Sequence, residues 1–191
     1  TGAASVTLPG TVEAWVNVGS VNGDYAVLAS VGSHDNGWEL RVDSTGVVSL
    51  VSSADGTQSR IASSTGVVMA GAWYHVVVAS DGAAASIRVN GIEVAAGVLS
   101  LAGGDIRFAA DAAGENSLYG SIAHIAVYPS VLSVARTTAH FAASGYEPGT
   151  GNLPTARAGD TYAVINWASP TETGGARIIG YRVEMREGSG D

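Results

Sequence analysis

The chain has 191 residues, of which 46% are hydrophobic and 14% charged, so it is composed like a folded chain with a sizeable core rather than a disordered one. Its net charge of −8 without a basic cluster argues against a nucleic-acid partner, and no apolar run reaches the roughly 18 residues of a membrane span. Cysteine is absent, which excludes a disulfide framework, a thiolate metal site and a cysteine nucleophile.

From about residue 5 to 128 the sequence alternates between β-prone runs and short turns rich in Gly, Asn and Asp. In residues 11–18 every second side chain is Val or Ala, which is the period of a strand with one buried face. Further runs of this kind lie at 25–31, 37–43, 47–53, 59–65, 72–80, 105–111 and 119–128. So many strands without a βαβ rhythm predict a two-sheet antiparallel sandwich.

Residues 71–97 contain three β-prone runs separated by two turn dipeptides, Asp81-Gly82 and Asn90-Gly91. Both dipeptides tolerate the positive φ angles of tight hairpin turns. The segment is therefore predicted to form an antiparallel meander.

The segment PSVLSVARTTAHFAAS, which begins at Pro129, breaks the strand pattern. Ala135 and Ala139 recur at helical spacing, and either Ser130 or Ser133 is available as an N-cap. We expect one short helix here, closing the first domain.

The composition shifts again near residue 147. Residues 147–153 are rich in Gly and Pro and are predicted to be a linker, so that the first domain spans residues 1–146. Residues 154–191 contain three further β-prone runs and are predicted to be a second, incomplete domain.

Four motifs, spread over about residues 8–143, carry a resemblance to a known family: TVEAWVNV, GWELRVDSTGVVSL, GAWYHVVVASDGAAASIRVNGIEVAAG and LYGSIAHIAVYPSVLSVARTTAHFAA. In this order they resemble the laminin-G-like, concanavalin A-like jelly-roll family. Residues 154–191 resemble the beginning of a fibronectin type III domain, through the strands around Trp167 and Tyr181. The resemblance implies an all-β fold: a two-sheet antiparallel jelly-roll sandwich with one short C-terminal helix, then a partial immunoglobulin-like sandwich.

The sequence lacks the usual signs of catalysis. Jelly rolls that cleave glycans need two adjacent carboxyl groups, but Glu13, Glu39 and Glu93 each stand alone within their strand. His75 lies inside a β-prone run, where a packed histidine is the simpler interpretation, and no Gly-x-Ser-x-Gly motif is present. We therefore expect a protein that is not an enzyme.

Two loops carry oxygen ligands that suit calcium. Asp35 lies in the first loop, and Asp111 and Glu115 lie in the second. The family resemblance implies a calcium ion at a sheet rim between such loops. The alternative is that these acidic residues are ordinary turn residues.

Ligand binding to such a sandwich relies on exposed aromatic rings and amides. Tyr25 and Tyr119 lie beside loops and are the candidate rings, and Asn116 is the candidate amide. The tryptophans match structural positions of their families or alternate with core residues, and we expect them to be buried: Trp15, Trp38, Trp73 and Trp167.

These observations predict a non-catalytic recognition or adhesion module of a larger extracellular or cell-surface protein, which binds a carbohydrate or a surface protein. The alternative is a structural or display module of a larger assembly, such as a phage virion or a surface filament, in contact with neighbouring subunits. A fold by itself does not separate the two.

Overall fold

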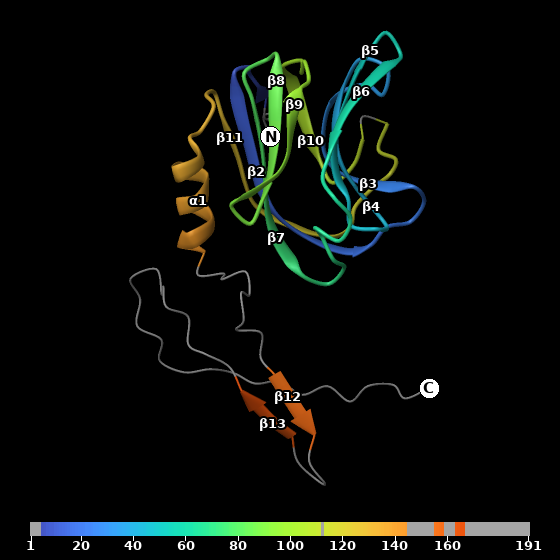
Figure 1. Cartoon of the computed structure of the whole chain (residues 1–191). Coiled ribbons are helices and arrows are strands. Elements are labelled where there is room, and N and C mark those ends of the chain that lie inside the picture. Colours follow the sequence, from blue (N-terminus) through green and yellow to red (C-terminus); the bar gives the residue numbers. More distant parts are fainter. Residues whose placement is uncertain (1–4, 112, 145–154, 159–162, 167–191) are drawn as a thin grey trace. The chain divides into compact units, whose positions relative to one another are not determined.

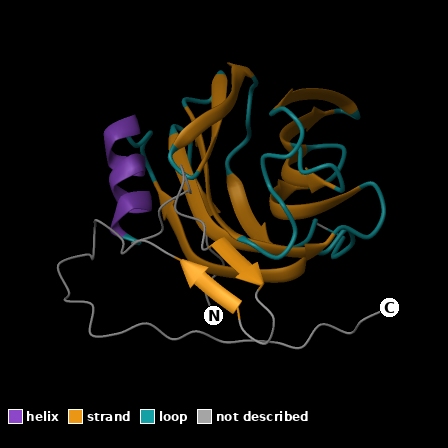
Figure 2. Cartoon of the chain, turned by 60° about the horizontal axis from the view of Figure 1, so that its bottom comes forward, coloured by secondary structure: helices purple, strands orange, loops and turns teal. Residues whose placement is uncertain are grey.

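Two antiparallel sheets face each other in the structure (Figures 1 and 2). It is a computed structural model that describes residues 5–111, 113–144, 155–158 and 163–166. The chain divides into two units, Thr1–Ala139 and His140–Asp191.

The first sheet has six strands in the order β1-β10-β3-β4-β5-β6. Its strands are β1 (Ser5–Val6), β3 (Tyr25–Gly32), β4 (Gly37–Asp43), β5 (Val48–Ala54), β6 (Thr57–Ala62) and β10 (Gly104–Phe108). The second sheet has five strands in the order β11-β2-β7-β8-β9. Its strands are β2 (Gly10–Ser20), β7 (Trp73–Ser80), β8 (Ala84–Val89), β9 (Ile92–Val98) and β11 (Tyr119–Tyr128). The predicted two-sheet sandwich is confirmed.

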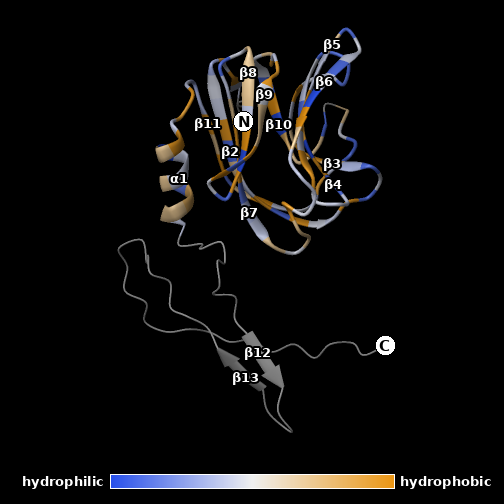
Figure 3. Cartoon of the chain, in the orientation of Figure 1, coloured by the Kyte–Doolittle hydropathy of each residue, from blue (hydrophilic) through white to orange (hydrophobic). Residues whose placement is uncertain are grey.

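The core lies between the two sheets and follows the period-two pattern of the sequence, which Figure 3 shows as hydrophobic and hydrophilic residues interleaved along the strands. In β2, the inward-facing side chains are those of Val12, Ala14, Val16 and Val18, and all four are buried. Alternation therefore decides which face of each strand enters the core.

The prediction that the tryptophans are buried is right for one of them and wrong for another. Trp38 is buried, and its indole N–H donates to the carbonyl oxygen of Ala102 at 3.0 Å. Trp73 is 37% exposed and Trp15 is half-buried, because both project from the face of their sheet that points away from the core. Trp167 lies outside the described residues.

The outer face of the five-stranded sheet carries a buried polar cluster, in which the predicted packing of His75 is confirmed. The Nε2 atom of His75 lies 3.5 Å from Glu13 Oε2, and its ring lies 5.4 Å from that of Trp15. The Tyr128 hydroxyl donates to Glu13 Oε1 at 2.7 Å, and burial together with this bond raises the pKa of Tyr128.

The predicted meander is present as β7, β8 and β9, and its turns differ in detail. Asn90 and Gly91 both have positive φ, at 51° and 79°, as predicted. In the first turn only Gly82 has a positive φ, at 98°. The Asp81 carboxylate accepts the amides of Ala83 and Ala84 there.

The predicted helix is α1 (Val134–Ala143), which follows β11. Ser133 is its N-cap, since the Ser133 hydroxyl accepts the amide of Arg136 at 3.2 Å. Ala135 and Ala139 are exposed, and Thr137 is the buried residue between them, so the helix buries a different face from the one that the alanines suggest. No helix in the described part of the chain is long and apolar enough to span a membrane.

In the second unit the structure describes one antiparallel pair, β12 (Thr155–Ala158) and β13 (Ala163–Asn166). The third predicted strand, the linker and the domain boundary near residue 146 lie outside the described residues. The resemblance to a fibronectin type III domain stays a prediction.

Leu50→Ala is expected to lower the free energy of unfolding by about 2–5 kcal/mol, because Leu50 is fully buried between the sheets and its truncation leaves a cavity. Val98→Ala is the matched control, since Val98 is 91% exposed and its truncation is expected to cost less than about 0.5 kcal/mol. Urea unfolding of both variants measures the difference, and equal costs would contradict the placement of the core.

Candidate functional site

A cavity of about 590 Å³ opens where the loop between β3 and β4 approaches the loop after β10. It brings together five of the six residues that the sequence singled out as candidate ligands: Tyr25, Asp35, Asp111, Glu115 and Asn116. The remaining described residues of its lining are Ser33, His34 and Ala113, which the sequence reasoning did not select.

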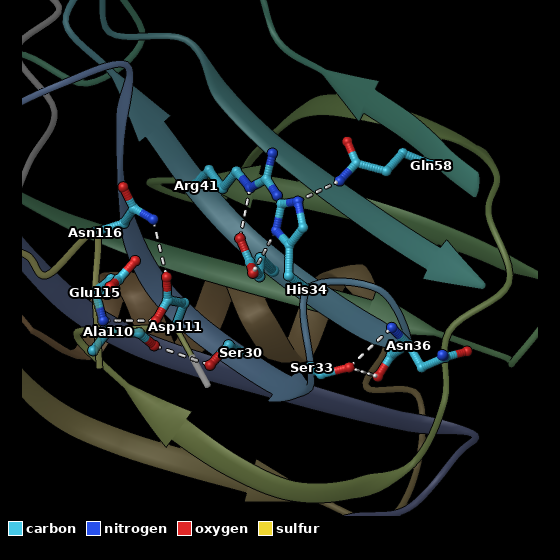
Figure 4. Close-up of polar contacts among 11 residues, drawn as sticks. Ser30, Ser33, His34, Asn36, Arg41, Gln58, Ala110, Asp111, Glu115 and Asn116 are labelled. Carbon is cyan, nitrogen blue, oxygen red and sulfur yellow. Dashed lines mark hydrogen bonds and ion pairs between the residues drawn. The ribbon is translucent and has the colours of Figure 1, made fainter. Parts of the chain in front are cut away.

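The described residues of the loop after β10 (109–111 and 113–118) contact β3 near a bulge in that strand. At this bulge the register of β3 against β4 shifts between Val27 and Ala29. The amide of Val27 donates to the carbonyl oxygen of Asn116 at 2.8 Å. The hydroxyl of Ser30 donates to the carbonyl oxygen of Ala110 at 2.9 Å (Figure 4).

Asp111 organises this loop from within. The residue is 8% exposed, and its carboxylate accepts the amide of Glu115 at 2.7 Å and the side-chain NH₂ of Asn116 at 2.9 Å (Figure 4). Burial alone raises the pKa of Asp111, but the hydrogen bonds from Asn116 and from backbone amides outweigh it and hold the pKa below its usual value. The Asp111 carbonyl oxygen also accepts a hydrogen bond from Arg107 Nη1, at 2.9 Å.

The loop between β3 and β4 forms the opposite wall. Gly32 begins it at a φ of +74°, where a Cβ would collide with the carbonyl oxygen of Asn36. The Ser33 hydroxyl accepts the amide of Asn36 at 3.1 Å, and the Asn36 side-chain oxygen accepts the amide of Asp55 at 3.0 Å. The loop is thus fixed at both ends, while the Asp35 side chain remains exposed at the cavity.

Tyr25 supplies the aromatic ring of the cavity. The sequence placed it among the exposed rings, but it is half-buried, because the guanidinium carbon of Arg41 lies 4.1 Å from the centre of its ring. Burial raises the pKa of the Tyr25 hydroxyl, against the opposing effect of Arg41, so the hydroxyl is a neutral donor at physiological pH.

Behind Tyr25 lies an ion pair that the sequence reasoning did not select. Arg41 Nε donates to Glu39 Oε2 at 2.8 Å, and Glu39 Oε1 lies 3.7 Å from His34 Nδ1 (Figure 4). The other ring nitrogen of His34 lies 3.3 Å from the amide nitrogen of Gln58. The signal for the pair is the spacing Glu-x-Arg in a strand, which places both side chains on one face.

Tyr119 is the predicted site residue that the cavity does not include. It is exposed as predicted, at 58%, but it lies at the start of β11 in the other sheet, paired with Ser20.

The predicted calcium ligands line one cavity, but their oxygens are not arranged for a metal ion. The described part of the chain has no group of three or more His, Asp or Glu side chains placed to hold one. Both carboxylate oxygens of Asp111 already face N–H donors, and the Asn36 oxygen faces the amide of Asp55. The donor set does not fit calcium, which favours the alternative that Asp111 is a turn residue.

The cavity therefore combines one aromatic ring with hydroxyl, amide, imidazole and carboxylate groups. A ring together with hydrogen-bond donors and acceptors is the kind of lining that holds a small polar ligand with an apolar side.

Residues 3–136 match the family model described as the concanavalin A-like lectin/glucanases superfamily. A comparison with curated proteins gives no match to this chain.

Among solved structures, the chain is similar to the CBM40 domain of a Ruminococcus gnavus IT-sialidase bound to α2,3 sialyllactose. The TM-score is 0.58 at 17% identity, over 71% of this chain and 84% of that one. The chain is also similar to a heptameric SAP-like pentraxin from Limulus polyphemus, with a TM-score of 0.53 at 14% identity, over 71% of this chain and 70% of that one. The receptor-binding domain of botulinum neurotoxin type G gives 0.54 at 12%, over 71% of this chain but only 38% of that one. At these identities the likeness concerns the fold alone.

Asp111→Asn is expected to lower the free energy of unfolding at pH 7 by about 2 kcal/mol, because the charged acceptor of the loop is lost. Since the folded-state pKa of Asp111 lies below the usual 3.8, its contribution is complete above that pH and disappears as pH falls through the folded value. Urea unfolding of both proteins from pH 7 to pH 2 measures this. A difference in the free energy of unfolding between the two proteins that stays constant with pH would contradict the role of the charged Asp111 carboxylate.

Calcium is expected to leave the thermal midpoint unchanged, because the candidate carboxylates are not placed to hold one ion together and both oxygens of Asp111 already accept hydrogen bonds. Thermal unfolding in calcium and in a chelator tests this on the wild-type chain. A calcium-dependent rise that Asp35→Asn abolishes would restore the metal site.

Proposed function

Since the chain belongs to the concanavalin A-like lectin/glucanases superfamily, we propose that its sandwich is a non-catalytic carbohydrate-binding module of a larger extracellular or cell-surface protein. The observation that carries this proposal is the cavity, which gathers Tyr25, Asp35 and Asn116 from distant parts of the sequence. Its position on loops supported by a rigid sheet is typical of binding sites.

The lining suits a sugar in particular. A pyranose has an apolar C–H face and a rim of hydroxyl groups, so it needs one ring to stack on and several donors and acceptors around it. Tyr25 provides the ring, while Asp35, Glu115 and Asn116 provide acceptors and donors at the mouth. The loops are fixed internally through Asp111 and Asn36, so little ordering entropy is lost when a ligand binds.

The similar structures give independent support for a binding role. One of them is a carbohydrate-binding domain that holds sialyllactose, and another is a receptor-binding domain. Both are similar to this chain at the level of the fold, which supports a recognition module and does not identify the ligand.

A role in an assembly is the second candidate, and the edge strand β9 favours it. Ile92 and Val98 are large apolar residues on this edge and are 65% and 91% exposed. An exposed edge strand offers unpaired backbone groups to a neighbouring chain. A structural or display module would use this edge, with the cavity playing no part.

Tyr25→Ala is expected to weaken glycan binding about tenfold or more, because it removes the stacking surface of the cavity. Tyr119→Ala is the matched control: it removes an exposed tyrosine that lies outside the cavity, and binding should be unchanged. The assay is binding of the whole chain to a panel of polysaccharides and bacterial cell-wall fractions.

Both variants must keep the wild-type thermal midpoint for the comparison to count. Equal losses in the two variants would place binding elsewhere. If the wild-type chain binds nothing in the panel, the assembly role is favoured. Light scattering then tests this role by comparing the self-association of the Val98→Asp variant with that of the wild type.

A further inference from the structure

Glu39 is a charged residue that the proposed sugar contacts do not use. It lies in β4, beside Ser30 of β3 and Val51 of β5, on the face of the six-stranded sheet opposite to the core. It is only 4% exposed. Burying a carboxylate to this degree costs free energy of folding unless a cation or several hydrogen-bond donors compensate its charge. The partner of Glu39 therefore indicates its role.

Its partner is Arg41, two residues along the same strand and therefore on the same face. The bond from Arg41 Nε to Glu39 Oε2 is 2.8 Å long, and the Arg41 side chain is 11% exposed. The same guanidinium covers the ring of Tyr25, which lines the cavity. A cation thus lies directly behind the cavity, already neutralised by an internal carboxylate.

The cavity itself has the opposite charge. Its described lining includes the carboxylates of Asp35, Asp111 and Glu115 and no arginine. Among the described residues, Arg107 also lies near this loop, and it donates to the carbonyl oxygen of Asp111. A ligand that enters the cavity therefore meets negative potential, with the nearest guanidinium groups engaged by the protein.

We propose that Glu39 is a specificity-determining residue, which withholds Arg41 from the cavity so that the site accepts uncharged sugars and rejects acidic ones. A planar guanidinium is the group that binds carboxylate and sulfate in a bidentate manner, so its engagement decides whether an anion can be held. The preference for uncharged sugars rests on the proposed function, whereas the exclusion of anions does not depend on it.

The test replaces Glu39 by its isostere. Glu39→Gln keeps the shape of the side chain and leaves the charge of Arg41 without its carboxylate, next to Tyr25. The whole chain is labelled with ¹⁵N, and the Tyr25 and Asn116 amides and Arg41 Nε are followed during titration with free N-acetylneuraminic acid and with inorganic sulfate. The pH is held at 8 throughout the titration.

The wild-type resonances are expected to stay in place up to anion concentrations on the order of 10 mM. The resonances of Glu39→Gln are expected to shift, with an anion affinity at least about tenfold higher than the limit that this concentration sets for the wild type. The double variant Glu39→Gln/Arg41→Met should lose this gain, because it removes the released cation. Glu39→Met replaces Glu39→Gln if the amide variant does not keep the wild-type amide spectrum, since it removes the same charge without a polar group.

Saturable binding of either anion to the wild-type cavity would overturn the proposal, as would a Glu39→Gln variant as silent as wild type. A gain that survives Arg41→Met would overturn the role given to Arg41. If the neutral glycan panel is silent but Glu39→Gln gains anion binding, the proposed function fails while the control of Arg41 by Glu39 stands.

Discussion

The carboxylate of Asp111 accepts hydrogen bonds from two donors within its own loop, and the geometry of the whole cavity follows from that arrangement. Because both donors point inward, the loop closes on itself and presents Asn116 to β3. There the Asn116 carbonyl oxygen accepts the amide of Val27, which lies at the bulge in β3. One charged acceptor thus shapes the wall of the cavity, and the bulge provides the place where this wall is anchored.

Two buried acidic residues near the cavity are compensated in different ways, and the difference sets its chemistry. Asp111 is compensated by neutral N–H groups, so its negative charge remains at the cavity. Glu39 is compensated by Arg41, so the two charges cancel behind Tyr25. The described lining of the cavity therefore keeps acceptors and includes no arginine. This difference is the basis for the proposed preference for a neutral, hydroxyl-rich ligand over an acid.

The sequence was informative where a local pattern carries the information. Alternation predicted the strands and the core face of β2, and loop composition placed Asp35, Asp111 and Asn116 among the candidates that the fold brings together. It failed for Trp73, because a match to a structural position of the family suggested burial, whereas the strand position puts the side chain on the outer face. The role of Glu39 was also hidden, since nothing in β4 itself shows how deeply an outward-facing residue is buried.

The most direct test of the central claim is an amide chemical-shift map of the whole ¹⁵N-labelled chain, titrated with the neutral oligosaccharide that binds most tightly. The account predicts that the shifts centre on Tyr25, on residues 33–35 and on Asn116, the positions that line the cavity. Shifts centred instead on the exposed edge strand β9 would contradict it, because the sugar would then bind at the surface assigned to the assembly role.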